Sequence, residues 1–257
     1  MKVTWYGTAT VAFDDGETKL LFDPFVRMNK RLKNNTPVEG FTGFGTIFIT
    51  HGHFDHLSSV PEIMKIDSDV QIYCTKTPAE TLSKFGADEN RVNVIKPGDT
   101  TEIGDFRVTA YSGSHLKFDA GYILSVFGRC ALRLPTLLKF CRYQKIMPDN
   151  KEIMIYLIEN KGKRILLTGT FGTVDGVVYP TDVDLLVLAN GGNSKIPQIT
   201  MPFIESTRPK RVLADHFDDA FPPMTKRGDV EEFKSIMNRL HPEIEFIIPT
   251  ERESVEF

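Results

Sequence analysis

The sequence has few cysteines, no long apolar run and no excess of positive charge, and each of these shortages excludes a class of protein. Cysteine occurs three times in 257 residues, at Cys74, Cys130 and Cys141, without the spacing of a cysteine metal site or a redox pair. No stretch of about 18 uncharged apolar residues occurs, which excludes an ordinary transmembrane helix. The formal net charge of −3 gives no reason to expect a general nucleic-acid binder, which is usually basic.

The first residues, "MKVTWYGTATVAFDDG", alternate apolar and polar side chains and therefore predict a strand hairpin in place of a signal peptide. Together with the odd number of widely spaced cysteines, this favours a reducing cytoplasm as the location. The length is near the upper end for one domain. We therefore expect a single domain over residues 1–257.

Short β-branched and aromatic runs, each bounded by turn residues, predict strands in both halves of the chain. In the first half they are "KVTWYG", "KLLFDPF", "TIFIT", "QIYCTK", "VNVIKPGD" and "FRVTAYS", and after residue 150 they are "IMIYLIEN", "KRILLTG", "DLLVLAN", "RVLADHF" and "EIEFIIP". A helix is predicted after Asp229, which forms a capping box with Glu232. Its apolar face consists of Val230, Phe233, Ile236, Met237 and Leu240. This order predicts an α/β chain of two mixed sheets with helices outside them.

Residues 120–148 lie between the two halves and are the one strongly basic part of the chain. The segment contains no acidic residue, and its basic residues are Arg129, Arg133, Lys139, Arg142 and Lys145. The spacing after Pro135 predicts a short amphipathic helix with an apolar side of Leu134, Leu137, Leu138 and Cys141. Three roles stay open for this insert: a lid or a subunit contact of a homo-oligomer, attraction of an anionic substrate, and peripheral membrane contact through residues 129–145.

Histidine is scarce, yet three of the six histidines fall within the stretch "THGHFDH". His51 and His53 are two residues apart at a strand end, so their side chains can project to the same side. Asp55 and His56 fall on the following turn or first helical residues. Burial of such groups without partners would cost about 1–3 kcal/mol each, and a bound cation removes that cost. Imidazole and carboxylate ligands suit Zn²⁺, Fe²⁺ or Mn²⁺.

Two further histidines are candidate ligands because each ends an apolar, strand-like run: His115 in "YSGSHLKFD" and His216 in "VLADHFDDAFPP". His241, in contrast, is predicted to lie in a helical and exposed place. Lys117, Asp119 and Asp218 lie close in sequence to the candidate ligands. Solvated loop residues are the simpler interpretation of these three, and contact with substrate or with the ligands is the alternative.

In this order, "LLFDPF", "THGHFDH", "GSHLKFD" and "ADHFDDAFPP" resemble the motifs of the metallo-β-lactamase superfamily. The lengths between them resemble the branch of cytosolic hydrolases that includes ascorbate-6-phosphate lactonase and the phospholipase D that acts on N-acyl phosphatidylethanolamine. The resemblance implies an αββα sandwich with a site for one or two zinc ions. It implies that His51, His53 and His115 hold one metal, that Asp55, His56 and His216 hold the second, and that Asp23 orients a ligand.

The sequence departs from the family pattern at one position. Where the family carries an aspartate that bridges the two metals, "KRILLTGTFGTVDG" has Thr170. A threonine hydroxyl is a poor metal ligand, so we expect the second metal to bind more weakly than the first. A filled site would also keep one more positive charge than its relatives and would favour an anionic substrate group. Asp175 stays open as a substitute ligand, although it lies beyond the expected turn.

These patterns predict a metal-dependent hydrolase that cleaves a small anionic ester, lactone or phosphodiester with a metal-bound hydroxide. The expected catalytic residues are Asp55, His53 and His115. One alternative is a degenerate protein that binds a single metal or a ligand without catalysis. The other is a membrane-peripheral phosphodiesterase that acts on phospholipid. A specific nucleic-acid partner is not expected.

Overall fold

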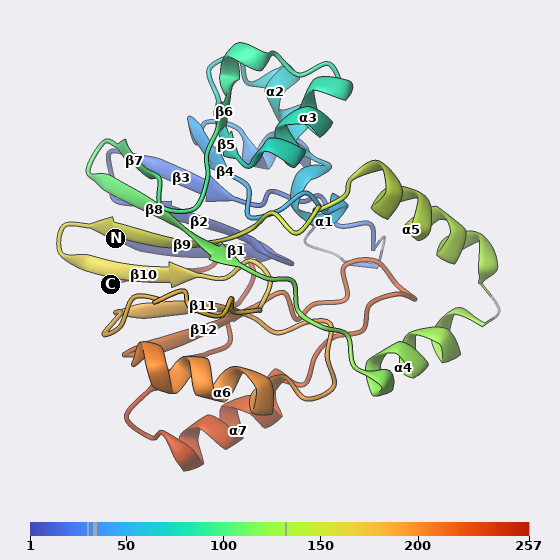
Figure 1. Cartoon of the computed structure of the whole chain (residues 1–257), viewed down its shortest axis with the longest axis vertical. Helices are drawn as coiled ribbons and strands as arrows, with labels where there is room; N and C mark the ends of the chain where they lie inside the picture. The colour runs from blue at the N-terminus through green and yellow to red at the C-terminus, as the bar shows by residue number, and fades with distance from the viewer. Residues whose placement is uncertain (30, 33–34, 132, 257) are drawn as a thin grey trace.

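The computed structural model describes residues 1–29, 31–32, 35–131 and 133–256. It consists of two seven-stranded sheets packed against each other, with helices on the outer faces (Figure 1). Apolar side chains of both sheets meet in one core, in which Phe22, Phe48, Tyr156 and Leu188 are completely buried. The predicted fold class, an α/β chain of two mixed sheets with helices outside them, is confirmed.

The first sheet contains most of the N-terminal strands, in the order β14-β1-β2-β3-β4-β5-β6. These strands are β1 (Lys2–Gly7), β2 (Thr10–Asp14), β3 (Lys19–Phe22), β4 (Thr46–Phe48), β5 (Gln71–Cys74), β6 (Val92–Val94) and β14 (Ser254–Glu256). Pairs from β14 to β3 are antiparallel and pairs from β3 to β6 are parallel. The predicted N-terminal hairpin is therefore the β1–β2 pair, whereas β14 lies outside the predicted strands.

The second sheet has the order β13-β12-β11-β10-β9-β8-β7. Its strands are β7 (Thr100–Ile103), β8 (Phe106–Gly113), β9 (Ile153–Asn160), β10 (Lys163–Leu167), β11 (Leu185–Ala189), β12 (Arg211–Asp215) and β13 (Glu245–Ile247). β8 precedes the insert in sequence but pairs with β9 after it, so the sheets do not coincide with the two halves of the sequence. β11 pairs with parallel strands on both sides and is buried along its whole length, which explains its continuous apolar run.

Helices cover the outer faces of the sandwich. α2 (Val60–Ile66) and α3 (Lys76–Lys84) lie on the first sheet, and α6 (Ile196–Thr207) and α7 (Val230–Leu240) lie on the second (Figure 1). The chain also forms a short α1 (Phe54–Leu57) and two 3-10 helices, η1 (Val38–Phe41) and η2 (Glu89–Arg91). None of the helices in the described part of the chain is long and apolar enough to cross a membrane.

One of the two hydrogen bonds of the capping box predicted for α7 is present: the carboxylate of Asp229 accepts the backbone N–H of Glu232 at 3.0 Å. The predicted apolar face is correct for Val230, Phe233 and Met237, which are buried. It is wrong for Leu240, which is 53% exposed because the helix ends there and leaves the sheet.

The basic insert forms two helices, α4 (Ala120–Cys130) and α5 (Leu134–Ile146), which project from the sandwich as a helical hairpin (Figure 1). We call these two helices the α4–α5 hairpin; residue 132 and the side chain of Leu134 lie outside the described residues. The predicted apolar side of α5 is wrong for Leu138 and Cys141, which are exposed. Instead, Phe140 and Tyr143 of α5 pack on Phe54 of α1, with ring centroids 5.7 Å and 5.3 Å apart.

Candidate metal centre

The loops that follow β4, β8, β10, β11 and β12 meet at one edge of the sandwich, around a cavity of about 450 Å³. Carboxyl ends of parallel strands gather polar loop residues at one edge of a sheet, and here both sheets contribute. All six of the histidine and aspartate side chains that the sequence predicts as ligands line this cavity: His51, His53, Asp55, His56, His115 and His216. They form two groups of three.

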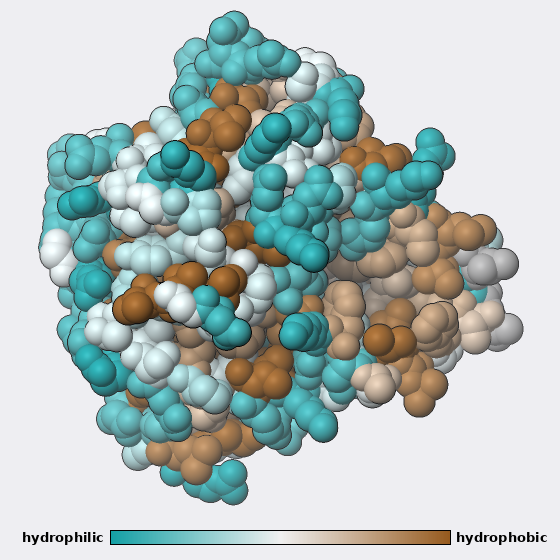
Figure 2. Space-filling view, in the orientation of Figure 1, coloured by the Kyte–Doolittle hydropathy of each residue, from teal (hydrophilic) through white to brown (hydrophobic). Residues whose placement is uncertain are grey.

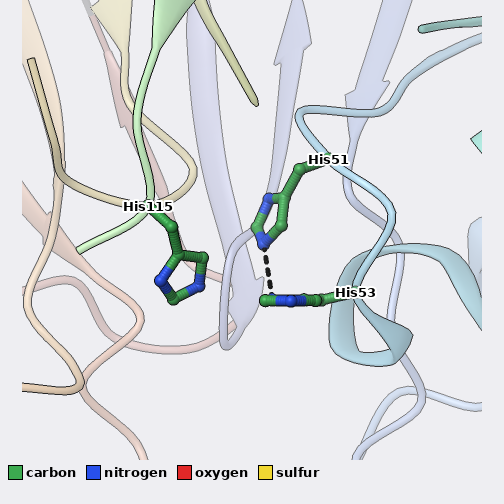
Figure 3. A group of neighbouring side chains, drawn as sticks. All are labelled: His51, His53 and His115. Atoms are coloured by element: carbon green, nitrogen blue, oxygen red, sulfur yellow. Dashed lines mark hydrogen bonds between the residues drawn. The ribbon is translucent and has the colours of Figure 1, made fainter. Parts of the chain in front are cut away.

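The first group contains His51, His53 and His115. His51 follows β4, His53 is the residue that precedes α1, and His115 follows β8 of the other sheet. One ring nitrogen from each lies within 4.8 Å of the other two, and the three rings converge on a common point (Figure 3). His51 Nε2 is 3.1 Å from His53 Nδ1.

The second group contains Asp55, His56 and His216. Asp55 and His56 lie in α1, and His216 directly follows β12 of the second sheet. Asp55 Oδ2 is 3.4 Å from His216 Nε2 and 3.9 Å from His56 Nε2. The two groups are adjacent, since the ring centroids of His51 and His56 are 4.0 Å apart.

Buried hydrogen bonds orient several of these rings. Asp23, which follows β3 and is completely buried, accepts the backbone N–H and the hydroxyl of Thr50 at 2.7 Å and 2.6 Å. The same carboxylate lies 2.8 Å from His56 Nδ1. A proton on Nδ1 that is donated to Asp23 leaves Nε2 as a free lone pair facing the cavity. His115 Nδ1 likewise lies 2.8 Å from the carbonyl oxygen of Leu116.

Backbone strain marks two residues at this edge. Asp23 and His216 have positive φ angles of 47° and 53°, which side chains other than glycine adopt rarely. His216 is held there by its backbone N–H, which donates to the carbonyl of Thr8 at 2.8 Å. Gly169, with a φ of 56°, brings the loop after β10 so close to Thr50 that a Cβ would lie 2.5 Å from its side chain. Three of the loops that meet at this edge thus contain a residue in a backbone conformation that side chains rarely adopt.

Burial determines the protonation of the first group. It lowers the pKa of His51 well below the usual histidine value, lowers that of His53 to about 4, and lowers that of His115. The neighbouring imidazoles act in the same direction, because each would repel a second positive charge. These three rings are therefore neutral at pH 7, which is the form that binds a metal ion.

The second group has the opposite electrostatics. Burial opposes a charge on His216, but the hydrogen bond and the charge of Asp55 outweigh it and raise the pKa of His216 to about 9. Burial would likewise raise the pKa of Asp55, yet His56 and His216 hold it below its usual value. In the absence of a metal, His216 therefore carries a proton that is paired with the Asp55 carboxylate at neutral pH.

The donor set fits divalent metal ions. A neutral imidazole carries a single N–H, so three ring nitrogens that face one point cannot satisfy one another by hydrogen bonds alone. Each of the three outer nitrogens has another partner: that of His51 the Thr50 hydroxyl at 3.0 Å, that of His115 the Leu116 carbonyl, and that of His53 the Asp149 carboxylate at 3.4 Å. Three imidazoles in one group, and a carboxylate with two imidazoles in the other, are sets that suit zinc.

Thr170 follows β10, is buried, and lines the same cavity as the two groups. Its hydroxyl lies 3.5 Å from the backbone N–H of Leu116, beside His115. Thr170 thus lies on a loop that faces the two groups, but its side chain offers a neutral hydroxyl in place of a carboxylate. Asp175 is exposed in a turn and belongs to neither group, so the structure gives no support to a substitute ligand there.

The remaining predicted residues have different environments. Asp218 is not a solvated loop residue: it is 8% exposed, and it accepts the backbone N–H of Thr8 at 3.1 Å and Nη1 of Arg27 at 2.9 Å. Asp119 caps α4 and binds the backbone N–H of Ser194. Lys117 is exposed, as the simpler interpretation had it. His241 follows α7 and is half-buried beside Glu205, so the prediction of an exposed helical residue is wrong.

Asp149 is a residue that sequence reasoning missed. It follows the α4–α5 hairpin, and its Oδ2 lies 3.4 Å from His53 Nε2, on the side of the ring away from the first group. Gly52 makes this approach feasible, because a Cβ there would lie 2.2 Å from the carbonyl oxygen of Pro148. No local sequence pattern predicts the contact of Asp149 with His53, because the two residues are almost 100 positions apart and meet only in the folded chain.

Comparison with known proteins identifies the family of this chain. The sequence profile of the beta-lactamase superfamily domain matches residues 18–202. A UPF0173 metal-dependent hydrolase of Chelativorans sp. (strain BNC1) is 33% identical over 120 residues, which are 45% of this chain and 48% of that protein. The chain thus spans about half the length of this relative. A UPF0173 metal-dependent hydrolase of Archaeoglobus fulgidus is 26% identical and matches over 100% of this chain and 99% of its own.

Solved structures show the same fold at low sequence identity. Igni18, a metallo hydrolase from Ignicoccus hospitalis, superposes with a TM-score of 0.69 at 19% identity and covers 100% of this chain and 98% of its own. The metallo-beta-lactamase fold protein YhfI from Bacillus subtilis superposes with a TM-score of 0.67 at 14% identity, over 100% of this chain and 98% of its own. The chain therefore belongs to the metallo-β-lactamase superfamily, as its histidine motif predicts.

Proposed function

We propose that the protein is a metal-dependent hydrolase that cleaves an ester, lactone or phosphodiester. The observation that carries the proposal is the pair of ligand groups, from both sheets, side by side in one open cavity. Relatives that match 45% and 100% of this chain are named metal-dependent hydrolases, and these names support the same class. Zinc is the metal we propose, because imidazole dominates the donor set.

The two groups of side chains would each hold one metal ion. His51, His53 and His115 would hold the first ion through neutral imidazoles, and Asp55, His56 and His216 would hold the second. Zinc held in such a site makes water nucleophilic near neutral pH and polarises the substrate oxygen. Asp55 stays ionised, so it can accept a hydrogen bond from the attacking water and fix its direction. Asp23 keeps the ring of His56 in place.

An anionic substrate group is part of this proposal. The second group offers one carboxylate, Asp55, and Thr170 adds no charge, so bound metal ions would keep an excess of positive charge. Lys226 and Arg227 are exposed and line the same cavity, which adds positive potential at its mouth.

Three cysteines without disulfide bonds support a reducing, cytoplasmic location.

The test is metal-dependent turnover of bis(p-nitrophenyl) phosphate and of a p-nitrophenyl ester by protein loaded with zinc. We expect hydrolysis of at least one substrate, loss of it on chelation, and loss of it in His53→Ala and His115→Ala. His241→Ala is the matched control, since His241 lies outside both groups and should keep full activity. Equal turnover in all four proteins would contradict the proposal.

Thr170 favours a second candidate, a protein that binds one metal without catalysis. Under this alternative, protein purified without chelator contains about one metal ion per chain, and Thr170→Asp raises the content to about two because it restores a shared anionic ligand. Mass spectrometry of both proteins measures the content. Rapid, chelator-sensitive hydrolysis by the wild type would rule this candidate out.

We also propose that the outer side of the α4–α5 hairpin contacts an anionic membrane surface. Leu124 and Leu138 are 74% and 61% exposed, and the hairpin carries Lys139, Arg142 and Lys145 without an acidic residue. A second copy of the chain would oppose these positive charges with its own. Sedimentation with phosphatidylserine vesicles at low salt should capture the wild type but not Leu124→Ser/Leu138→Ser; no capture of the wild type would contradict the proposal.

A further inference from the structure

The cavity above the two ligand groups is mainly apolar on the side formed by the α4–α5 hairpin. We infer that the substrate carries an alkyl or acyl chain of medium length, which lies against this hairpin while the hydrolysable group lies at the ligand groups. The inference rests on the proposed function and specifies its substrate class. It also modifies the expected small substrate, since about 450 Å³ is within the range of sites for drug-sized ligands.

The first apolar wall begins at the ligands themselves. The ring of Phe118 lies 5.7 Å from that of His115, and Tyr122 of α4 stacks on Phe118 at 5.5 Å. Ile123 and Val126, one and four positions further along α4, line the same cavity. A continuous apolar surface therefore leads from the first histidine group along the helix.

The second apolar wall lies on the other side of α1. Phe54, between His53 and Asp55 in sequence, contacts Phe140 of α5 and Phe221, with ring centroids 5.7 Å and 5.1 Å away. Phe140 and Phe221 stack on each other at 5.9 Å. Both also line the cavity, together with Met224. Aromatic and aliphatic groups therefore face each other across the space beyond the ligands.

Arg129 is the basic residue of the insert that lines this part of the cavity, and it directs three of its five N–H groups to partners within the chain. Arg129 donates from Nε to the carbonyl of Pro223 at 2.9 Å and from Nη2 to the carbonyl of Met224 at 2.9 Å, and its Nη1 bonds to Ser125. It therefore fixes the end of α4 to the loop after β12. The expectation that the insert attracts an anionic substrate stays a prediction, because these bonds use only three of the five N–H groups of Arg129.

Anchors at both ends of α4 keep this helix over the site. Asp119, at the start of α4, accepts the backbone N–H of Ser194 at 2.9 Å and bonds to its hydroxyl. Arg129 provides the second anchor near the end of α4. Because both anchors hold the helix against loops of the second sheet, the apolar wall is formed before any ligand arrives, which lowers the entropic cost of binding.

Two large side chains of this wall are exposed to solvent: Phe118 by 52% and Phe127 by 60%. Figure 2 shows that brown, apolar side chains gather on the projecting hairpin and around the hollow beside it. Contiguous exposed apolar surface of this kind marks ligand or partner sites. An alkyl chain in the cavity would remove part of it from water, whereas a small hydrophilic ester would not.

The test measures binding, so that it does not depend on turnover. Methyl-, butyl- and octylphosphonate, which share one anionic head group, are titrated calorimetrically into zinc-loaded protein. We expect about two- to fourfold tighter binding per added methylene, as burial of each CH₂ predicts. Val126→Asp and Phe118→Ala should flatten this dependence on chain length.

Leu124→Asp is the matched control, because Leu124 belongs to the same helix but does not line the cavity. It should keep the wild-type dependence on chain length. Equal affinity for the three phosphonates in the wild type would overturn this inference and leave the proposed function intact. Binding of none of them would count against the head-group site and thus against both. If Val126→Asp and Phe118→Ala showed the same dependence on chain length as the wild type, the alkyl chain would bind elsewhere and the inference would be overturned.

Discussion

At the scale of single residues, the two ligand groups differ in the protons that a metal must displace. The rings of His51, His53 and His115 are neutral at pH 7, because burial lowers the pKa of each. His216 keeps its proton until about pH 9, because Asp55 stabilises the charged ring. A metal would therefore bind the first group without displacing a proton from its rings, and would bind the second only by displacing a proton from His216.

This difference predicts distinct proton release for the two metal ions. At pH 7 the ligand side chains of the first zinc ion should release almost no proton, and those of the second about one. Since His216 must lose its proton, the affinity of the second group should rise with pH, about tenfold per unit between roughly pH 6.5 and 8. Calorimetry in two buffers of different ionisation enthalpy measures both quantities. The same release for both ions would contradict the assignment of the His216 proton.

Asp149 carries a second prediction at this scale. Its carboxylate lies 3.4 Å from His53 Nε2 and favours the tautomer in which Nδ1 faces the first group. Asp149→Asn removes the charge, so zinc affinity of the first group should fall about 10- to 100-fold, the usual effect of losing such a partner. A competitive zinc chelator measures the affinity. Asp175→Asn is the control, because Asp175 is exposed and outside both groups.

At the scale of elements, the end of the α4–α5 hairpin passes directly over the histidine loop. A Cβ on Gly52 would lie 2.2 Å from the carbonyl oxygen of Pro148, next to Asp149. Gly52→Ala should therefore push the hairpin end away, destabilise the protein by about 1–3 kcal/mol and weaken zinc binding together with it. Thermal unfolding and the chelator assay measure the two effects.

Gly128 provides the control for this prediction. It lies in α4, and a Cβ there would meet nothing within 4 Å. Gly128→Ala should leave zinc affinity unchanged and stabilise the helix by about 0.5–1 kcal/mol, because alanine loses less backbone entropy than glycine. If Gly52→Ala and Gly128→Ala behaved alike, the close passage over Gly52 would not be what positions Asp149.

Local sequence patterns predict the elements well where a pattern stays within one segment. The β-branched runs around β4, β8 and β12 are such cases, and "THGHFDH" predicted four candidate ligands because they follow one strand end. Patterns fail where partners come from distant segments. The sequence could not show that β8 joins the second sheet, or that Phe140 rather than Leu138 packs on Phe54. Asp218 was misjudged for the same reason, because its partner Arg27 is 191 residues away.

At the scale of the whole molecule, each ligand group takes residues from both sheets. His51 and His53 follow β4 of the first sheet, whereas His115 follows β8 of the second; Asp55 and His56 likewise meet His216 across the same boundary. A metal in either group is therefore a cross-link between the sheets. Without it, the packing at this edge depends on apolar contacts and on buried pairs such as Arg27 with Asp218.

Zinc should therefore raise the stability of the entire fold. At a free concentration of 100 times the dissociation constant, binding to the folded state alone adds about 2.7 kcal/mol for each site. The gain from the second group should be larger at pH 8 than at pH 6.5, because the proton of His216 competes less as the pH rises toward about 9. Calorimetric unfolding temperatures with and without chelator measure this gain. His115→Ala should lose the stability gain that comes from zinc in the first group, at both pH values. His241→Ala should keep the full gain. A gain that did not depend on His115 would mean that zinc acts elsewhere than at the boundary between the two sheets.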